Sequence, residues 1–490
     1  MQLREYQELF VNNIAIELTN HRKIVAQLAT GGGKTICFSA ICERYIKKSG
    51  KSVLILVHRK ELLKQAVHSL SKANQINAQV VIAGMRTIPE APVYVAMIET
   101  AFRRLEQFKN IGMIIIDESH LGNFTKVIDF FNEQFIIGFT ATPLAAKKDA
   151  PLKKFFDSIV CGVDIAELIK SGNLCNEITF KPAVEVNRSE LKMKMGEFDE
   201  KTMAIEFSNP KYINSTVDAY RKYSEGSKTI IYNCNIEHSQ LVTNAFIRAG
   251  YNCKHIDGES SDRDKILEWF DCTPDAILCN VGIATTGFDQ PDIETVIVNK
   301  ATASMPLWLQ MCGRGARPHP IKLIFKIIDM GGNAMTHGLW SSPKNWKDLF
   351  YNPPKKGNGV APIKDCPSCG AMIHVRCLAC PHCDYEFPKK ELEEDFISDF
   401  IAVSNMIDVT DMIEKNKNYK DYYTLFKISH YLAINSKYTT PKMNDEIFDF
   451  ILNKNFELAR QWCKQKNKKW NDFHSDLVKS SLIKELQKIK

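Results

Sequence analysis

Residues 28–35 of this 490-residue chain read LATGGGKT, and this stretch decides the fold. An apolar run at 24–28, of the kind found in buried β-strands, precedes it, and a helical pattern begins at Ile36. A strand, a glycine-rich loop and a helix in this order make a phosphate-binding loop. Backbone N–H groups are expected to converge on phosphate oxygens at the helix N-terminus. The residues that allow this are Thr30, Gly31, Gly32 and Gly33.

Two side chains at the end of this loop carry chemistry. Lys34 would reach the β- and γ-phosphates of a nucleotide, and the Thr35 hydroxyl would be a ligand of Mg²⁺. Leu28 stands where the general motif has its first glycine, which points away from kinases of small metabolites and towards a motor protein. The loop therefore predicts ATP and Mg²⁺ as cofactors.

The composition is that of an ordinary globular chain. A hydrophobic content of 44% is enough for substantial cores, and 490 residues are enough for about three domains. The net charge of +7 permits a polyanionic partner without requiring one. The opening MQLREYQELF lacks the apolar core of a signal peptide, and no run approaches the roughly 18 apolar residues that cross a membrane. We therefore expect a protein of a reducing interior such as the cytoplasm, with no membrane partner.

Short β-type runs alternate with helical stretches in the first part of the chain. They lie at 24–28, 52–57, 93–97, 113–116 and 135–138. This alternation predicts a parallel sheet with helices on both faces, and ligands bind such sheets at the carboxyl ends of the strands.

Residues 113–120, MIIIDESH, place two carboxylates just past a buried strand. In that position Asp117 would hold Mg²⁺, directly or through water, and Glu118 would polarise the water that attacks the γ-phosphate. FTATP, at 139–143, follows the next apolar strand. Its two threonine hydroxyls could respond to the state of the metal site and transmit a change there to a second domain.

Two further strand ends lie on the same rim. Arg59 follows VLILV and Thr100 follows the run at 93–97, and either side chain could contact a nucleic-acid backbone. QLATGGGKT, VHRKEL, IIIDESH and FTATP, in this order and spacing, resemble the first motor lobe of superfamily two helicases and translocases. They are similar to the branch with UvsW-type phage recombination helicases and the motor subunits of type I and type III restriction enzymes. The resemblance implies that Arg4 and Gln7, in LREYQ, belong to the segment that reads adenine.

The alternation breaks between about residues 164 and 210 and then resumes. Further β-type runs lie at 228–232, 253–256, 276–279, 295–298 and 323–328, which predicts a second α/β lobe. Arg314 and Arg317 are three residues apart, so on a helical turn their guanidinium groups would face the same way. Two planar guanidinium groups from the opposite lobe suit the charge that develops on the γ-phosphoryl oxygens.

This second lobe extends the resemblance to about residues 1–345. NVGIATTGFDQP, at 280–291, and LQMCGRGARP, at 309–318, look like motifs V and VI of the same superfamily. The resemblance assigns further roles to Gln310, which completes the ATP site with the two arginines, to Gly287 and Asp289, near the ribose or the lobe interface, and to Thr285, at the nucleic acid.

Two C-x-x-C knuckles follow a Pro/Gly-rich linker at 352–362. Fifteen cysteines are an odd number, and five of them crowd into residues 366–383, which indicates a metal rather than disulfides. Four thiolates at this spacing can close a tetrahedral, structural Zn²⁺ site. Cys377, His374 and His382 are rival ligands. The preferred four share the C-P-x-C turn, and they are Cys366, Cys369, Cys380 and Cys383.

The sequence thus predicts an α/β protein with two tandem RecA-like parallel-sheet lobes, a small zinc ribbon and an α-helical C-terminal region. The expected boundaries are 1–165 for lobe 1, 166–210 for a linker or insertion, 211–350 for lobe 2, 351–364 for a linker, 365–388 for the ribbon and 389–490 for the helical region. That last region could line nucleic acid through lysine and tryptophan, or form a helical bundle with a solvated basic face.

We expect an ATP-hydrolysing DNA helicase that translocates on single-stranded, forked or branched DNA and unwinds or remodels it. ATP would close the two lobes and hydrolysis would release them. Rival hypotheses are a duplex-DNA translocase without processive unwinding, an RNA helicase, and a zinc-ribbon adaptor with an inactive motor. The expected partners are DNA, with RNA as the alternative, and proteins of replication or recombination.

Overall fold

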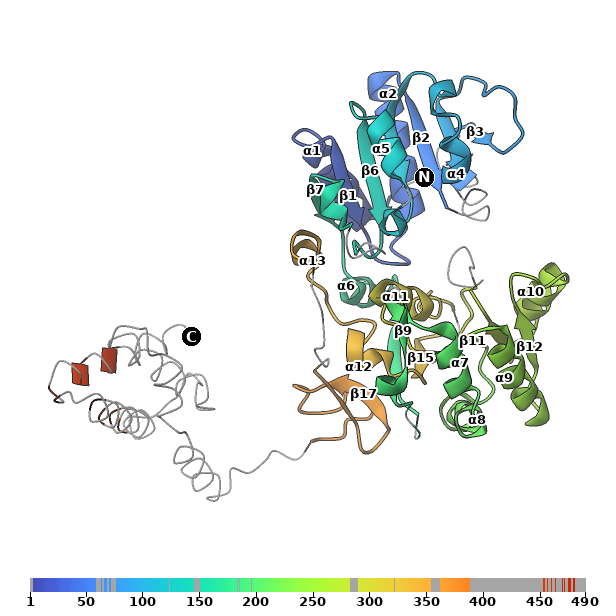
Figure 1. The fold of residues 1–490 in the computed structure, drawn as a ribbon, viewed down its shortest axis with the longest axis vertical. Helices are drawn as coiled ribbons and strands as arrows, with labels where there is room; N and C mark the ends of the chain where they lie inside the picture. Colours follow the sequence, from blue (N-terminus) through green and yellow to red (C-terminus); the bar gives the residue numbers. More distant parts are fainter. Residues whose placement is uncertain are drawn as a thin grey trace. The chain divides into compact units, whose positions relative to one another are not determined.

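The computed structural model describes residues 3–387, apart from short gaps, and isolated positions between 453 and 480. The gaps lie at 59–62, 64–65, 68–69, 72–75, 123, 145–149, 183, 185, 195, 283–289, 321 and 354–361. The chain divides into two units, Met1–Phe387 and Pro388–Lys490. The helical region predicted for 389–490 lies almost wholly outside the described residues, and the fold below is that of the first unit (Figure 1).

A seven-stranded sheet forms the first lobe. Its strands lie in the order β3-β4-β2-β5-β6-β1-β7, and every neighbouring pair is parallel. The strands are β1 (Lys23–Gln27), β2 (Ser52–Val57), β3 (Ala78–Val81), β4 (Val93–Met97), β5 (Ile111–Ile116), β6 (Phe135–Thr140) and β7 (Ser158–Cys161). All five runs predicted from the sequence are strands of this sheet, and β3 and β7 form its two edges.

Both faces of the first sheet are buried, as is usual for parallel sheets. Ile24 and Ala26 pack in an apolar cluster with α1 (Glu5–Glu17) and α2 (Lys34–Ser49). Val25, between them, packs in a second cluster with α4 (Ile98–Ala101) and α5 (Thr125–Phe130). Since successive side chains of a strand point to opposite faces, the two clusters are the cores of the two faces.

The second sheet has eight strands in the order β12-β13-β11-β14-β15-β8-β17-β16. The pairings from β12 to β8 are parallel and the last two are antiparallel. The strands are β8 (Asn176–Phe180), β11 (Thr229–Asn233), β12 (Cys253–Ile256), β13 (Ile277–Asn280), β14 (Thr295–Asn299), β15 (Ile324–Asp329), β16 (Ile363–Asp365) and β17 (Ala371–His374). The five runs predicted for the second lobe are all present.

Two parts of this sheet come from segments that the sequence analysis placed outside lobe 2. Strand β8 lies within the predicted linker or insertion, residues 166–210, and it pairs with β15. Strands β16 and β17 lie within the predicted linker and ribbon, and β17 pairs with β8. The predicted ribbon is therefore continuous with the second sheet.

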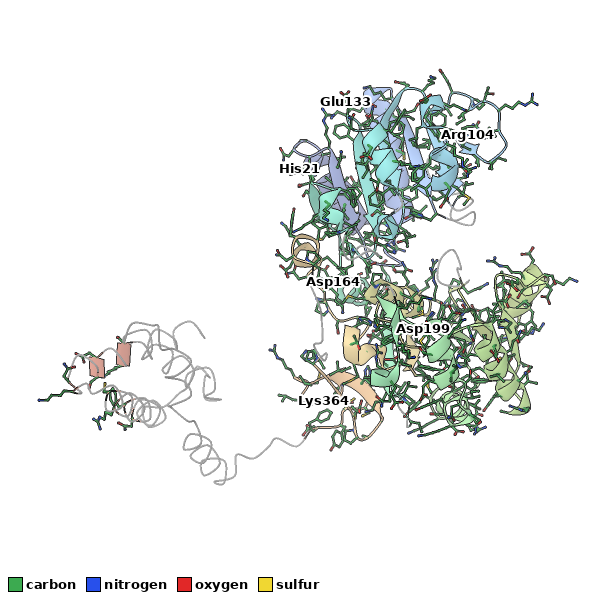
Figure 2. All side chains as sticks on the ribbon, in the orientation of Figure 1. His21, Arg104, Glu133, Asp164, Asp199 and Lys364 are labelled. Atoms are coloured by element: carbon green, nitrogen blue, oxygen red, sulfur yellow. The ribbon has the colours of Figure 1, made fainter. Side chains whose placement is uncertain are left out.

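Helices cover both faces of the second sheet. They are α6 (Ile165–Lys170), α7 (Glu200–Phe207), α8 (Pro210–Ser224), α9 (Ile236–Arg248), α10 (Arg263–Cys272), α11 (Met305–Cys312) and α12 (Asn333–His337). Helix α13 (Trp346–Tyr351) instead packs against β7, and its Phe350 lies in a core of the first lobe. A separate hairpin of β9 (Met193–Lys194) and β10 (Glu197–Phe198) lies between α6 and α7 in the chain. Asp164, labelled in Figure 2, opens α6 and accepts a hydrogen bond from the Glu167 N–H at 2.8 Å.

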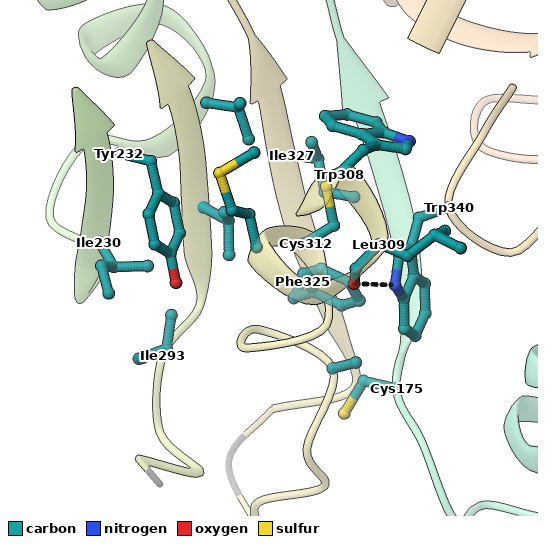
Figure 3. Packing of buried hydrophobic residues seen from close by; sticks show 14 of the residues in the cluster. Cys175, Ile230, Tyr232, Ile293, Trp308, Leu309, Cys312, Phe325, Ile327 and Trp340 are labelled. Carbon is teal, nitrogen blue, oxygen red and sulfur yellow. Dashed lines mark hydrogen bonds between the residues drawn. The ribbon is translucent and has the colours of Figure 1, made fainter. Parts of the chain in front are cut away.

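The larger apolar cluster of this lobe includes side chains of β11, β14, β15 and α11. Figure 3 shows how Trp308, Phe325 and Trp340 fill it, and the Trp340 indole donates to the Leu309 carbonyl at 3.1 Å. This packing fixes the direction of α11, and the predicted arginines follow its C-terminus. Among the helices that the structure describes, none combines the length and the apolar character needed to cross a membrane.

Candidate functional site

Strand order brings three of the predicted motifs side by side. β1, β6 and β5 are neighbours in the first sheet. The glycine loop (residues 28–35), FTATP and DESH follow these strands at their carboxyl ends. The Leu28 N–H donates to the Thr140 carbonyl at 3.1 Å, which ties the glycine loop to the end of β6. The sheet thus gathers the motifs at the edge where ligands bind open α/β sheets.

Glycines give the loop a shape that other residues would strain. Gly31 and Gly33 both have a φ of 85°, in the left-handed region. A Cβ on Gly33 would lie 2.4 Å from Gln7 Nε2. Gly33 is the residue that caps α2, so Lys34 and Thr35 occupy the first turn of that helix. Free N–H groups and the helix dipole favour a phosphate there.

We expect Gly33→Ala to weaken ATP binding. The left-handed backbone would cost an alanine about 1–2 kcal/mol, and the new Cβ would displace Gln7 from the loop. The Kd for ATP should rise about tenfold or more, because about 1.4 kcal/mol corresponds to a factor of ten. Equilibrium binding of a fluorescent ATP analogue measures the change.

Gly50→Ala is the matched control for this substitution. Gly50 also has a positive φ, 66°, but nothing lies within 4 Å of a Cβ built on it. It terminates α2 at the end opposite to Lys34. Equal losses of ATP affinity in the two variants would contradict the account given for Gly33.

Lys34 and the acidic pair, Asp117 and Glu118, form a buried group of charges. Lys34 Nζ lies 3.8 Å from Glu118 Oε1, and His120 Nδ1 lies 3.3 Å from Glu118 Oε2. The Glu118 side chain is only 12% exposed, and its backbone φ of 50° is in the left-handed region, which is uncommon for a residue with a Cβ. Strain of this kind clusters at active sites, where the surrounding structure holds it in place.

The two carboxyl groups have opposite pKa shifts. Burial, with the neighbouring charge of Glu118, raises the pKa of Asp117 to about 7. Burial acts to raise the pKa of Glu118 as well, but the charge of Lys34 and the contact with His120 outweigh it and lower the pKa to about 2. At neutral pH Glu118 is therefore ionised, whereas Asp117 is poised to gain or lose a proton.

We expect Mg²⁺ binding to weaken below neutral pH. Metal ligands must be deprotonated, and the Asp117 carboxyl, with its pKa raised to about 7, takes up a proton as the pH falls. The affinity for Mg²⁺ should be highest above that pKa and should fall by up to about tenfold for each pH unit below it. A Mg²⁺ titration of the ADP-bound chain from about pH 5.5 to about pH 8.5 measures this dependence.

Asp117→Asn removes the titrating group and serves as the reference in that experiment. This variant should bind Mg²⁺ weakly at every pH, without a step near neutrality. A wild-type affinity that stays constant across the range would show that Asp117 is not a ligand, or that its pKa is not raised.

His120 connects the acidic pair to the end of β6. The Thr140 hydroxyl donates to the Thr142 carbonyl at 3.0 Å and accepts from the Thr142 N–H at 3.0 Å. A hydroxyl has one hydrogen, so His120 Nδ1, 3.0 Å from Thr140 Oγ1, is the donor in that contact. The Nδ1 proton therefore lies between Thr140 and Glu118. Through this proton a change at Glu118 can reach Thr140, which is one of the FTATP threonines predicted to sense the metal site. The sequence analysis had assigned no role to His120.

Gln7 holds the glycine loop from the side of α1. Its side chain is buried, Nε2 donates to the Gly32 carbonyl at 3.2 Å, and Oε1 accepts from the Arg4 N–H at 3.0 Å. The Tyr6 hydroxyl donates to the same Gly32 carbonyl at 3.1 Å. Arg4 is exposed, and its guanidinium donates to the Asn173 side chain. The segment expected to read adenine thus lies against the loop backbone.

The arginine turn, residues 313–317, differs from the expected helical turn. Helix α11 ends at Cys312, so Arg314 and Arg317 lie beyond it. The N–H groups that follow bond to carbonyls three residues earlier, which keeps the chain tightly turned. Gly315 packs closely in this turn, and a Cβ there would lie 2.4 Å from the Phe325 ring. The two arginines therefore follow the helix and do not lie on one of its turns.

Arg314 is the arginine that the structure brings to the acidic pair. Its charge contributes to lowering the pKa of Glu118. The charge of Arg317 acts instead on Lys322, whose pKa is lowered to about 8 chiefly by burial. Arg314 is therefore the stronger candidate for a phosphate contact.

The arginine turn lies close to the glycine loop. A Cβ on Gly313 would lie 3.2 Å from Thr30 Cγ2. Gln310, on α11, is buried. Both lobes also line a small cavity beside this contact, formed by Gln27, Ala29, Thr30, Ala141, Thr142, Ile165, Leu309, Trp340 and Trp346. The two lobes thus meet at the predicted nucleotide site.

The predicted nucleic-acid contacts are only partly described. Arg59, Thr285, Gly287 and Asp289 lie outside the described residues. Thr100 is half-buried in α4, at the carboxyl end of β4. His58, just before Arg59, is partly buried, and burial lowers its pKa. Charges of Glu99, His120 and Glu118 act on His58, so this rim lies near the acidic pair.

Sequence reasoning missed two residues that touch the glycine loop and its neighbours. Leu174 is buried, and a Cβ on Gly31 would lie 2.6 Å from Leu174 Cδ2. Asn173 accepts from the Arg4 guanidinium. Both lie in the break between the two alternating patterns, and no local motif distinguishes them from an ordinary linker.

The four preferred cysteines converge in space. Among the described residues that could hold a metal ion, the sulfur atoms of Cys366, Cys369, Cys380 and Cys383 lie within 4.8 Å of one another. Cys366 Sγ is 3.6 Å from Cys383 Sγ, and Cys369 Sγ is 3.8 Å from Cys380 Sγ. A tetrahedral zinc ion with Zn–S bonds of about 2.3 Å places its sulfurs about 3.8 Å apart. The donor set and its spacing fit Zn²⁺.

Cys377 and the two histidines do not belong to this cluster. The Cys377 carbonyl accepts from Lys364 Nζ at 2.8 Å, and the ammonium lies 3.4 Å from the centre of the Phe387 ring. Cys377 thus contributes its backbone to the cysteine hairpin, residues 363–387. Of the ligand sets considered from the sequence, the one with two C-P-x-C turns is the one that comes together.

Two family models match the chain. Residues 1–145 match the family described as the res subunit of type III restriction enzymes, and residues 211–319 match the conserved C-terminal domain of helicases. The first match spans the glycine loop and the acidic pair, and the second spans the arginine turn.

Two curated proteins share 30% of their aligned residues with the chain. A 51.5 kDa protein of a Lactococcus phage (isolate 7-9) aligns over 376 residues, 75% of this chain and 79% of the phage protein. IRC3 of Saccharomyces cerevisiae, assigned by name as an ATP-dependent helicase, aligns over 367 residues, 70% of this chain and 53% of the yeast protein. The chain therefore spans about half the length of the yeast relative.

Solved structures share the fold at lower identity. A fragment assigned as the HsdR subunit of a type I restriction enzyme from Vibrio vulnificus has a TM-score of 0.56 at 20% identity, over 70% of this chain and 67% of that chain. The type ISP restriction-modification enzyme LlaBIII has a TM-score of 0.52 at 15% identity, over 100% of this chain and 42% of that chain. The chain belongs to the superfamily two helicases and translocases, ATP-hydrolysing enzymes, in the branch that includes restriction-enzyme motor subunits.

Proposed function

We propose that this chain is an ATP-dependent DNA helicase that couples ATP hydrolysis to translocation and to unwinding or branch remodelling. The observation that carries the proposal is the contact of the arginine turn with the glycine loop, where a Cβ on Gly313 would lie 3.2 Å from Thr30 Cγ2, beside Lys34 and the acidic pair. A nucleotide held by the glycine loop would touch both lobes. Its hydrolysis would then change how strongly the lobes hold each other.

Two side chains would hold the phosphates from opposite lobes. Lys34 would contact the β- and γ-phosphates, and Arg314 would stabilise the charge that grows on the γ-phosphoryl oxygens. Gln310 and Arg317 would support this site from the second lobe. Thr35 and Asp117 would hold Mg²⁺, which neutralises phosphate charge when bound.

Glu118 would orient the attacking water and accept its proton. Lys34 Nζ lies 3.8 Å from Glu118 Oε1 and contributes to the lowered pKa of this carboxyl group. When Lys34 binds the phosphates instead, it moves its charge away from Glu118, so the carboxylate becomes a stronger base. The contact between Lys34 and Glu118 therefore makes the base effective only in the presence of ATP.

Nucleic acid would lie across the carboxyl edges of the two sheets. Arg59, Thr100 and Thr285 would contact its backbone, and Gly287 and Asp289 would lie near the ribose of ATP or the lobe interface. Each opening and closing of the lobes would then move the chain along a phosphate backbone. His120, through Thr140, would report the state of Glu118 to the end of β6.

DNA is the nucleic acid along which we expect the chain to move. The matched family describes a restriction-enzyme subunit, and the LlaBIII structure that shares the fold is bound to DNA. Single-stranded, forked or branched DNA would be the substrate, with proteins of replication or recombination as partners. A bacterial or phage-infected cytoplasm would supply them, and its reducing conditions suit a chain with 15 free cysteines.

ATP turnover with a panel of nucleic acids tests the proposal. Single-stranded, duplex, forked and four-way DNA should stimulate turnover more than RNA of the same sequence, and Lys34→Ala should abolish it. Strand displacement compared with triplex displacement separates a helicase from a duplex translocase. Stronger stimulation by RNA than by DNA would identify RNA as the nucleic acid along which the chain moves. No turnover on any substrate would leave only the adaptor hypothesis.

We further propose that the four cysteines bind one Zn²⁺ per chain. Elemental analysis of the purified wild-type chain should give about one zinc per chain. Cys369→Ser should lose the metal, because a serine hydroxyl cannot replace the thiolate. Cys377→Ser should keep it, since Cys377 lies outside the cluster. Loss of zinc in Cys377→Ser with retention in Cys369→Ser would contradict the assigned ligand set.

A further inference from the structure

The connecting segment, residues 173–180, begins at the predicted ATP site. Asn173 accepts from the Arg4 guanidinium, and Arg4 in turn donates its backbone N–H to Gln7. Leu174 is 4% exposed and packs so closely on Gly31 that a Cβ there would lie 2.6 Å from Leu174 Cδ2. The start of the segment therefore helps to define the shape of the glycine loop.

The next residue of the segment holds the arginine turn. The Cys175 N–H donates to the Ala316 carbonyl at 2.8 Å, and Cys175 Sγ lies 3.4 Å from the Arg317 carbonyl and 3.5 Å from the Lys322 carbonyl. Cys175 belongs to the apolar cluster that also contains Trp340 and Leu309, and Figure 3 shows it at the lower side of this cluster. The backbone that carries Arg314 and Arg317 is thus bonded to the segment.

The segment continues as β8 between two very different neighbours. On one side β8 pairs with β15 along all five of its residues. On the other side Thr179 and Phe180 pair with Met372 and Ala371 of β17. Lys181, just past β8, forms an ion pair with Asp365 at 2.6 Å. The cysteine hairpin therefore covers the C-terminal end of β8 on the flank that β15 leaves free.

The cysteine hairpin has little of its own to hold it together. The buried members of its separate apolar cluster are Cys366, Ile373 and Cys380. Two-stranded hairpins are marginal alone, and small segments with four cysteines fold on binding the metal. Met372 instead packs into the core of the second lobe. The order of β17 along β8 then depends on closure of the cysteine site.

We propose that the cysteine hairpin, closed on Zn²⁺, positions the arginine turn for ATP hydrolysis by fixing the connecting segment through β17. This inference rests on the proposed function, and it gives the metal site a structural role in support of ATP hydrolysis. When the site is open, β17 releases the flank of β8, and the support under Ala316 and Gly31 loosens. The kcat for ATP then falls, because a misplacement of about 1 Å can cost about a hundredfold.

Cys383→Ser and Cys383→His form the decisive pair of variants. Cys383 is exposed, so either side chain fits, and histidine completes a Cys₃His set that binds zinc, whereas serine does not. Cys383→Ser should lose zinc, exchange its amide hydrogens faster at 174–180 and 313–317, and lose about 10- to 100-fold in kcat. Cys377→Ser should match wild type in all three measurements, and Cys383→His should retain zinc and the slow exchange at 174–180 and 313–317 that Cys383→Ser loses.

Hydrogen exchange separates this role from a general loss of fold. Residues of β11 and β13, far from the hairpin in strand order, should keep their protection in Cys383→Ser. If that variant unfolds, reversible zinc removal from wild type by a chelator gives the same comparison without a substitution, and added zinc must restore protection and kcat. Faster exchange confined to 363–387 with unchanged kcat would overturn the proposal.

Lys34→Ala distinguishes this proposal from the proposed function. It should abolish turnover while zinc content and exchange at 174–180 stay as in wild type. If the wild-type chain hydrolyses no ATP on any nucleic acid, the proposed function fails. The hydrogen-exchange measurement alone then decides whether the cysteine hairpin fixes the connecting segment.

Discussion

Arg314→Ala is expected to lower the DNA-stimulated kcat for ATP by about 10³- to 10⁵-fold. Arg314 lies on the lobe opposite to Lys34, and its charge reaches Glu118 of the acidic pair. A guanidinium that meets the γ-phosphate in this way stabilises charge that grows only in the transition state, so kcat should fall far more than ATP affinity. Steady-state turnover at saturating DNA, with ATP binding measured separately, checks both parts of this expectation.

Arg317→Ala is the comparison that tests the choice of arginine. Its charge acts on Lys322 rather than on the acidic pair, so the loss in kcat should be smaller. Arg314→Lys keeps a positive charge but lacks the planar fork, and it should recover only part of the activity. A larger loss in Arg317→Ala than in Arg314→Ala would reverse the assignment.

Glu118→Gln should lower kcat by about 10²- to 10⁴-fold, since an amide cannot accept a proton from water. ATP should still bind, because the glycine loop and Lys34 remain. The same substitution removes a negative charge that raises the pKa of Asp117. The pKa of Asp117 should therefore fall, and Mg²⁺ should bind at lower pH than in wild type. Single-turnover hydrolysis of bound ATP and the Mg²⁺ titration measure the two effects.

Glu99→Gln provides the matched control for this second prediction. Glu99 is an exposed carboxylate whose charge acts on His58, so it removes one acidic group near the rim without touching Lys34. Turnover should stay within about twofold of wild type, as for most surface changes. Hydrolysis at a normal rate in Glu118→Gln would show that another group activates the water.

Strands that are buried on both faces could be predicted from the sequence almost residue by residue. β2 and β4 have the predicted bounds, because a parallel strand covered on both faces is a continuous apolar run. The edge strand β3 was missed, since three of its four residues are only partly buried and its sequence, AQVV, carries no such run. Each motif is likewise a short, continuous stretch of sequence, so the glycine loop and the acidic pair were found without any knowledge of the sheet.

Long-range pairing could not be predicted in the same way. Nothing in the sequence of β8 shows that it pairs with β15, which lies more than a hundred residues later, or with β17 on its other side. The termination of α11 was missed for a similar reason. Gly315 is needed because Phe325 packs against it, and that contact exists only in the folded lobe.

Shortening the chain at residue 350, the end expected for the second lobe from the sequence, would uncover one flank of β8. Its backbone N–H and carbonyl groups would then be open to pairing with other molecules, as bare strands in solution commonly are. Pieces of this protein that stop there should precipitate or self-associate, whereas pieces that run through Phe387 should stay monodisperse. Strand β17, which pairs with β8, and the short strand β16 at the outer edge of the sheet would thus protect the motor from association with other molecules.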